Sequence, residues 1–268
     1  MIDRQNQPHK TTHSGSNKQG GQAADLRCED AAQFLTTLFE PEDIILIRPI
    51  ESWTDANGQR HAKTDWKRTE HIRVGVGHGP GWIHNPVILA AKIAEYNATA
   101  EEERLNYYFG VCPRFRSAVE DRKAGKRWVF DKSFQIRTVR FLWFDIDGSD
   151  EEETKTAIAA AALPPPTVVT ASGNGFHLYW KLDAPHVIDD AGEPQAIVEV
   201  WEDGKNGKRR RVSYLEDAHG DLLPLKSGIR PELSPKAELI QDAIAGISKE
   251  IGGDHTQDLA RILRIPGT

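Results

Sequence analysis

The feature of the sequence that most constrains the fold is the apolar run Val139–Ile146. Successive side chains of a strand point to opposite faces of a sheet, and apolar side chains occupy both faces along this run. A strand that is covered on both faces lies inside a sheet, so the run predicts a central, buried strand. Polar residues at its end would then stand at the rim of that sheet.

The other patterns predict a mixture of helices and strands without regular alternation, which is typical of the α+β class. Asn57 followed by Gly58 predicts a tight hairpin turn. Helical periodicity predicts helices over Cys28–Phe39, Pro86–Tyr96, Glu151–Ala162, Lys236–Glu250 and Thr256–Leu263. Apolar runs bounded by turn residues predict strands over Ile44–Ser52, Leu105–Val111, Thr167–Ala171, Phe176–Leu182, Ile197–Trp201 and Arg210–Tyr214.

Composition changes along the chain indicate its domain organisation. Residues 1–24 are polar and aperiodic, which predicts a disordered tail. Residues 25–268 carry the periodic segments and are expected to form one domain. Within it, residues 183–230 are expected to form an insertion with its own hairpin, on which the basic residues Lys205 and Lys208–Arg211 lie.

Charge and cysteine content exclude several classes of protein. The net charge of −6 argues against a protein that coats nucleic acid, although local basic patches could still bind it. The apolar runs are far shorter than a membrane-spanning helix, and the N-terminal stretch is polar, so we expect no membrane partner and a cytoplasmic location. Cys28 and Cys112 stand far apart and indicate neither a disulfide framework nor a cysteine zinc site.

Two aspartates end the apolar strand. Asp145 and Asp147 are two residues apart, so their side chains project from the same face of a strand. Two carboxylates held this close repel each other unless a cation lies between them. Oxygen ligands favour Mg²⁺ or Mn²⁺ over zinc. The alternative is a surface turn with two solvated acids.

A second segment, Ser172–Trp180, places two glycines in a turn between strands. Backbone amides at Gly173 and Gly175 could approach an anion closely. The strand that follows puts His177 and Tyr179 on one face, so Ser172, the glycines and His177 form a candidate phosphate clamp. The alternative is a tight hairpin with a histidine that only completes the local hydrogen bonding.

A third segment begins with Gly252-Gly253-Asp254. Asp254 could be a helix N-cap, with Gln257 completing a capping box, or a third metal ligand. Arg261 and Arg264 are three residues apart and would share one face of a helix, where they could meet phosphates. A solvated or ion-paired face is the alternative for both arginines.

Taken in this order, the three segments resemble the archaeo-eukaryotic primase superfamily, in particular the primase-polymerases of plasmids, phages and other mobile elements. The resemblance covers about residues 25–268. It implies an RNA-recognition-like sheet packed against a second αβ unit. It also implies a DNA primase or polymerase that joins nucleotides on a single-stranded DNA template.

The resemblance further implies roles for individual residues. Asp145, Asp147 and Asp254 would hold two divalent metals, and Ser172 and His177 would hold the incoming NTP or dNTP. Arg261 and Arg264 would contact phosphates. Arg114 would be a further phosphate or template contact. Apart from the resemblance, the charge of the basic hairpin residues Lys208, Arg209 and Arg210 makes them a candidate template or primer contact, and a solvated hairpin is the alternative.

Two departures from the family pattern matter. Some primases carry a Cys/His zinc element, but here only His71, His78 and His84 cluster and no cysteine is near, so zinc is not expected. The chain also stops at Pro266-Gly-Thr, where such motifs continue into more protein. We therefore expect a longer parent with a helicase or other replication domain.

Two other functions compete. A haloacid-dehalogenase-like phosphatase also has an Asp-x-Asp-Gly motif and a later Gly-Asp-x-x-x-Asp, which Gly253–Asp258 imitates. In such an enzyme Asp145 would be the nucleophile and Asp147 the acid and base. However, its second motif follows a strand, whereas Asp254 follows a predicted helix. A noncatalytic nucleic-acid-binding module would need a basic, aromatic surface and no set of three acids.

Overall fold

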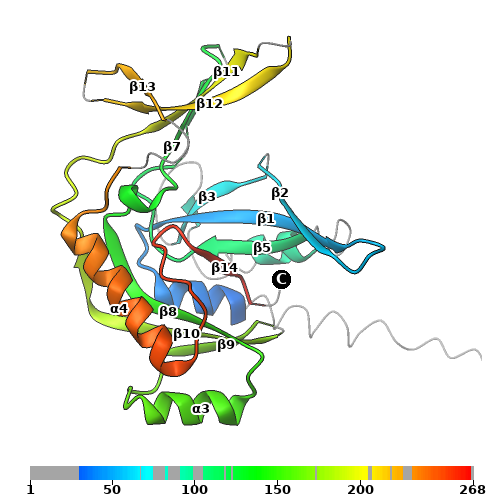
Figure 1. The fold of residues 1–268 in the computed structure, drawn as a ribbon, viewed down its shortest axis with the longest axis vertical. Coiled ribbons are helices and arrows are strands. Elements are labelled where there is room, and N and C mark those ends of the chain that lie inside the picture. The colour runs from blue at the N-terminus through cyan, green and yellow to red at the C-terminus, as the bar shows by residue number, and fades with distance from the viewer. Residues whose placement is uncertain are drawn as a thin grey trace, which may run out of the picture.

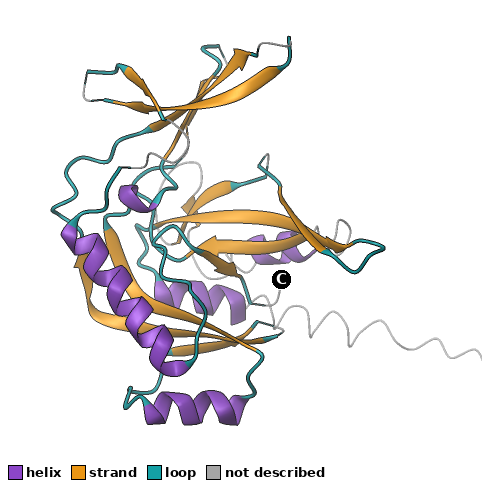
Figure 2. Ribbon diagram, in the orientation of Figure 1, coloured by secondary structure: helices purple, strands orange, loops and turns teal. Residues whose placement is uncertain are grey.

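The computed structural model describes residues 30–66, 68–74, 82–83, 91–98, 105–117, 119–121, 123–172, 174–204, 207–217, 219–225 and 231–266. The tail expected over residues 1–24 lies outside these ranges. Figure 2 shows helices packed beside sheets, and along the chain the helices and strands follow one another in irregular order, which confirms the α+β class. None of the described helices is both long and apolar enough to cross a membrane.

The first sheet contains the N-terminal strands and the last strand of the chain (Figure 1). Its order is β14-β5-β1-β3-β4, and β2 forms a hairpin with β1 through the expected turn at Asn57-Gly58. The left-handed backbone of Gly58, with φ of 79°, permits this turn. The bounds are β1 Ile44–Thr54, β2 Arg60–Thr64, β3 Glu70–Val74, β4 Trp82–Ile83, β5 Leu105–Gly110 and β14 Ile262–Arg264.

A second sheet, in the order β8-β10-β9, and a third, in the order β13-β12-β11-β7-β6, complete the fold. Both are antiparallel. The second sheet consists of β8 Thr138–Asp147, β9 Val168–Ala171 and β10 Gly175–Val187. The third consists of β6 Val119–Asp121, β7 Lys126–Val129, β11 Ile197–Asp203, β12 Arg209–Glu216 and β13 Leu222–Pro224. The helices are residues 30–38 and 91–98, η1 Ser133–Gln135, α3 Glu151–Ala160 and α4 Pro235–Ile251.

The helix at residues 30–38 joins the first two sheets through aromatic contacts. The ring of Phe34 lies 5.3 Å from Phe109 of β5 and 5.1 Å from Tyr179 of β10, measured between ring centroids. Phe39, just past the helix, contacts Phe109 and Phe141 of β8 edge to face. Such pairs are favourable beyond the area that they bury. One core therefore fixes the two sheets relative to each other.

The expected central position of the strand at Val139–Ile146 is wrong, because β8 is an edge strand of its sheet. Its free edge is covered by the segment that follows α4. The Asp254 amide donates to the Asp145 carbonyl at 2.8 Å, and the Trp143 indole donates to the Thr256 carbonyl at 2.7 Å. Trp143 is fully buried. The apolar run follows from the two faces of β8, because Phe141 and Trp143 on one face and Phe144 and Ile146 on the other are all buried. An edge strand can be covered on both faces as a central strand is.

The helix predicted over Thr256–Leu263 is also wrong. The chain there forms a turn and then β14, which pairs with β5. Leu263 lies opposite Phe109 and is buried with it, so packing against the sheet outweighs the local helical pattern. Arg261 precedes this strand and Arg264 ends it, so the two do not share a helical face.

Asp131 ties three parts of the fold together from a buried position after β7. Its carboxylate lies 2.9 Å from the Nε2 of His71 on β3, 3.6 Å from Arg48 on β1 and 3.8 Å from the buried Arg114. Burial alone would raise the Asp131 pKa, but the hydrogen bond to His71 and the charges of His71, Arg114 and Arg48 lower it to about 2. The carboxylate therefore stays ionised and holds the two guanidinium groups.

We predict that Asp131→Asn lowers the free energy of unfolding by about 3 kcal/mol at pH 7, because two largely buried guanidinium groups lose their counter-charge. The folded-state pKa lies below the unfolded value, so the contribution is complete above about pH 4 and is lost as the pH falls towards 2. Urea titrations at several pH values measure it, and the gap between the two proteins should narrow on acidification. Exposed Asp183→Asn is the control and should change stability by less than about 0.5 kcal/mol. A similar loss in both variants would contradict the assignment.

Candidate active site

The pairing of β8 with β10 puts Asp145 directly opposite His177. The Nε2 of His177 lies 3.4 Å from a carboxylate oxygen of Asp145, and His177 is buried. Both residues continue the face on which the core aromatics Phe141 and Tyr179 lie, because alternate residues of a strand share a face. The site therefore begins where the core between the first two sheets ends.

One step further along the same pair of strands, Asp147 lies opposite Gly175. A Cβ atom on Gly175 would come within 1.9 Å of the Ile146 carbonyl oxygen, so only glycine fits here. Beyond it, the Gly148 amide donates to the Asn174 carbonyl at 2.7 Å. The sequence indicates Gly175 as a possible anion contact. The structure explains the glycine in another way, because two backbones approach each other closely at this position.

Asp254 arrives at the site from the end of α4. The helix ends at Gly252, whose φ of 72° is left-handed, and the Gly253 amide bonds to the Ser248 carbonyl at 2.7 Å. The next amide, that of Asp254, donates to the Asp145 carbonyl. A Cβ on Gly253 would meet the Asp145 carbonyl oxygen at 3.2 Å, so this glycine allows Asp254 to lie against β8.

The charges of the other two aspartates act on Asp145. Burial, together with the charges of Asp147 and Asp254, raises the pKa of Asp145 to about 6, and the charge of Arg261 opposes this rise. Burial lowers the pKa of His177 to about 4, with Arg261 and Arg264 acting in the same direction and Asp147 against them. At neutral pH, therefore, His177 is uncharged and Asp145 is mostly ionised.

The residues of this site fit a divalent cation chemically. The carboxylate oxygen of Asp145 that lies 3.4 Å from the His177 Nε2 is buried and has no hydrogen-bond partner in the described part of the chain, and the charges of Asp147 and Asp254 act on this carboxylate. Across the described ranges, no three His, Cys, Asp or Glu side chains gather closely enough to hold a metal by themselves. Mg²⁺ does not need such a cage, because it usually binds one or two carboxylates together with water and substrate phosphates.

Of the remaining predicted nucleotide contacts, some lie at this site and one lies outside the described residues. Ser172 lies at the turn before β10, where its amide donates to the Gly175 carbonyl, whereas Gly173 lies outside the described residues. Arg261 donates weakly to the His255 carbonyl at 3.5 Å. Through their charges, Arg261 acts on both Asp145 and His177, and Arg264 acts on His177.

The predicted template contact at Arg114 is wrong. Arg114 is 3% exposed and bonds to the Cys112 carbonyl, so it is a core residue that no nucleic acid can reach. Of the three histidines that cluster in the sequence, His71 is paired with Asp131, and His78 and His84 lie outside the described residues.

The basic hairpin lies on the third sheet, which Figure 1 places at the opposite end of the molecule from α3. Its arginines face acids across the strands: Arg209 lies 3.9 Å from Asp203, and Arg210 lies 3.9 Å from Glu202. Both arginines are well exposed, and Lys208 precedes them in an exposed position. The hairpin is therefore nearly charge-balanced and does not join the aspartates.

Comparison with known proteins gives one structural likeness and no match in sequence. No protein-family model matches the chain, and no curated protein matches it. A solved structure described as the archaeo-eukaryotic primase domain of the cyanophage S-2L primase-polymerase aligns with 88% of this chain and 80% of its own, at 14% identity and a TM-score of 0.43. Values this low do not by themselves establish a shared fold.

The β8–β10 pairing can be tested at Gly175. We predict that Gly175→Ala lowers the thermal midpoint and separates the ends of the two strands, because the added Cβ collides with backbone that cannot move aside cheaply. The matched control is Gly246→Ala on α4, where an added Cβ meets nothing within 4 Å. There the same change should stabilise the protein by about 0.5–1 kcal/mol.

Calorimetry of both variants decides the matter. If Gly175→Ala proves as stable as the parent, the close approach of β10 to Ile146 is wrong, and with it the placement of Asp147.

Proposed function

We propose that the protein is a template-dependent nucleotidyltransferase that makes or extends primers on single-stranded DNA. One observation carries the proposal. Asp145 lies between His177 on the paired strand β10 and Asp254 on the other edge of β8, with Asp147 at the end of the strand. A set of mutually repelling carboxylates beside a buried, neutral histidine is typical of a site that binds cations and phosphates.

Asp145, Asp147 and Asp254 would hold two divalent cations, Mg²⁺ or Mn²⁺. When bound, these would favour ionisation of the attacking 3′-hydroxyl and stabilise the departing pyrophosphate. The raised pKa of Asp145, caused by burial and by the charges of Asp147 and Asp254, supports this assignment, because a nearby cation would stabilise the ionised carboxylate against both.

The protein's own groups would position the triphosphate. His177 is uncharged at neutral pH, so its ring can donate one hydrogen bond without attracting the aspartates into a closed ion pair. Ser172 offers a hydroxyl at the turn before the same strand. Arg261 and Arg264 supply positive charge on the side of the site that would hold the phosphates. Positioning and preorganised charge would then account for most of the rate.

The first sheet offers a path for the template. Arg264 of β14 pairs with Tyr108 of β5, which pairs with Arg48 of β1, so the three side chains share one face of the sheet. Arg48 lies under the ring of Trp66 at 4.7 Å and is held by Asp131, so the template would meet the Trp66 ring, which is 51% exposed, rather than the Arg48 guanidinium. Alternating aromatic and cationic groups are the means by which proteins hold single strands without reading their sequence. This row takes the role first assigned to Arg114 and the basic hairpin.

Catalysis is tested with Asp145→Asn and Asp147→Asn. We expect each to lower nucleotide incorporation on single-stranded DNA at least about a hundredfold, since even outer-shell partners of a metal contribute up to that factor. Asp150→Asn is the matched control. Asp150 is the N-cap of α3, where asparagine caps equally well, so incorporation should stay within about twofold. Labelled products on a gel, with Mg²⁺ or Mn²⁺ and with NTPs and dNTPs separately, provide the measurement.

The same assay separates the alternatives. Phosphate release from a simple ester in the parent, without incorporation, would favour the phosphatase. Metal-independent DNA binding without either reaction would favour a noncatalytic module. Equal incorporation by the parent and Asp145→Asn would refute the proposed site.

A further inference from the structure

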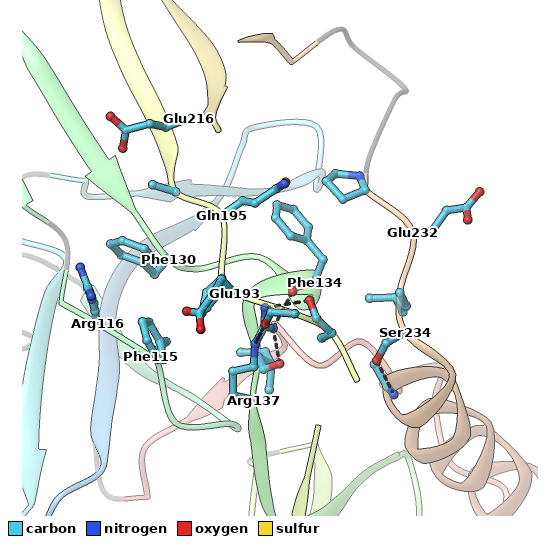
Figure 3. Close-up of a pocket in the computed structure, with 18 of the residues that line it drawn as sticks. Phe115, Arg116, Phe130, Phe134, Arg137, Glu193, Gln195, Glu216, Glu232 and Ser234 are labelled. Atoms are coloured by element: carbon cyan, nitrogen blue, oxygen red, sulfur yellow. Dashed lines mark hydrogen bonds between the residues drawn. The ribbon is translucent and has the colours of Figure 1, made fainter. Parts of the chain in front are cut away.

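A cavity of about 910 Å³ lies far from the aspartates, between the base of the third sheet and the start of α4 (Figure 3). Asp254 follows the C-terminal end of α4, whereas Ser234 and Ala237 at the N-terminal end line the cavity. A 17-residue helix spans about 25 Å. The cavity is therefore a separate site, and its volume is within the usual range of ligand pockets.

Aromatic rings form the apolar part of the cavity. Phe115, Trp128, Phe130 and Phe134 all line it, and Phe115 is 41% exposed. The rings of Phe115 and Phe130 lie 6.5 Å apart. Exposed aromatic surface in a concave site is typical of places that bind another molecule. This part of the cavity suits an apolar side chain.

Carboxylates outnumber cations around these rings. The acids are Asp190, Glu193, Glu216, Asp217 and Glu232, and the cations are Arg116 and Arg137. Arg137 is committed, because its guanidinium donates to the carbonyls of Phe134, Ile136, Ala191 and Gly192. The guanidinium of Arg116 lies 5.3 Å over the Phe115 ring, which shows that this ring face accepts a cation.

The N-terminus of α4 does not reverse this charge balance. The Ser234 hydroxyl accepts from the Ala237 amide, and Asp190 accepts from the Lys236 amide at 3.0 Å. These bonds already use amides that could otherwise hold an anion. Phosphates, and with them nucleotides and nucleic acids, are therefore disfavoured in this cavity.

We propose that this cavity is a docking site for a basic peptide segment of a partner protein, one that carries arginine or lysine next to an apolar side chain. The apolar side chain would enter between the phenylalanine rings. The cationic groups would meet Glu193 and Glu216, the latter held by a bond from the Trp128 indole at 2.9 Å. A peptide fits better than a small cation, because the cavity offers apolar surface and several separated carboxylates at once. The site does not depend on the catalytic proposal.

The test uses the full chain and a fluorescein-labelled nonapeptide that alternates arginine with leucine, with fluorescence anisotropy as the readout. We expect saturable binding that weakens about tenfold in Glu193→Gln/Glu216→Gln, because two charge contacts are lost. Phe115→Ala should weaken binding without any change in charge. The same peptide with citrulline in place of arginine should bind poorly to the parent.

The matched control is Glu151→Gln/Glu152→Gln on α3, which removes the same two charges from exposed positions outside the cavity. It should bind the peptide as the parent does. Equal weakening in both double variants would reduce the effect to general attraction by an acidic protein and would overturn the proposal. Displacement of the peptide by spermine at an equal concentration, or no saturable binding, would overturn it as well.

Discussion

The antiparallel pairing of β8 with β10 is the constraint on which the candidate site depends. Its register puts His177 opposite Asp145 and Gly175 opposite Asp147, and a shift of β10 by one residue would turn His177 to the face opposite Asp145. The register is fixed by the core, because Phe141 and Tyr179 on the same face pack against each other at 5.7 Å and against Phe34 and Phe39. Apolar packing at one end of the strands therefore specifies the chemistry at the other end.

The same arrangement explains how like charges stay together. Asp145 is half buried, and the charges of two other aspartates act on it. Its raised pKa shows that this environment disfavours the ionised carboxylate. Burying an unpaired charge opposes folding, so other contacts must hold the carboxylates in place. Two backbone contacts do so: the β8–β10 ladder on one edge of β8, and the bond from the Asp254 amide on the other. Both contacts use glycines, Gly175 and Gly253, because a side chain would keep the backbones apart.

Much of this was predictable from the sequence, and the exceptions have a common cause. Period-two and helical patterns predicted both ends of β8 and α4, and the start of β10, to within one residue, because those patterns record burial directly. The predicted end of β10 at Leu182 is too early, since the strand continues past a register shift to Val187. Thr256–Leu263 failed, since its pairing with β5 is a contact between residues far apart in sequence. The central position expected for β8 failed for the same reason. Apolar side chains show that both faces of a strand are covered, but they do not show whether a strand or a loop lies along its edge.

The arginines show that charge counted along a chain differs from charge in space. Lys208–Arg211 form the densest basic run of the sequence, yet the described structure sets Arg209, Arg210 and Arg211 against Asp203, Glu202 and Glu199. Arg261 and Arg264 stand apart in the sequence, but both act electrostatically on the buried His177. A protein with a net charge of −6 can therefore keep a locally positive side to an acidic site. The sign of the local charge at each surface depends on which residues pair across the strands, and the register of the sheets determines that pairing.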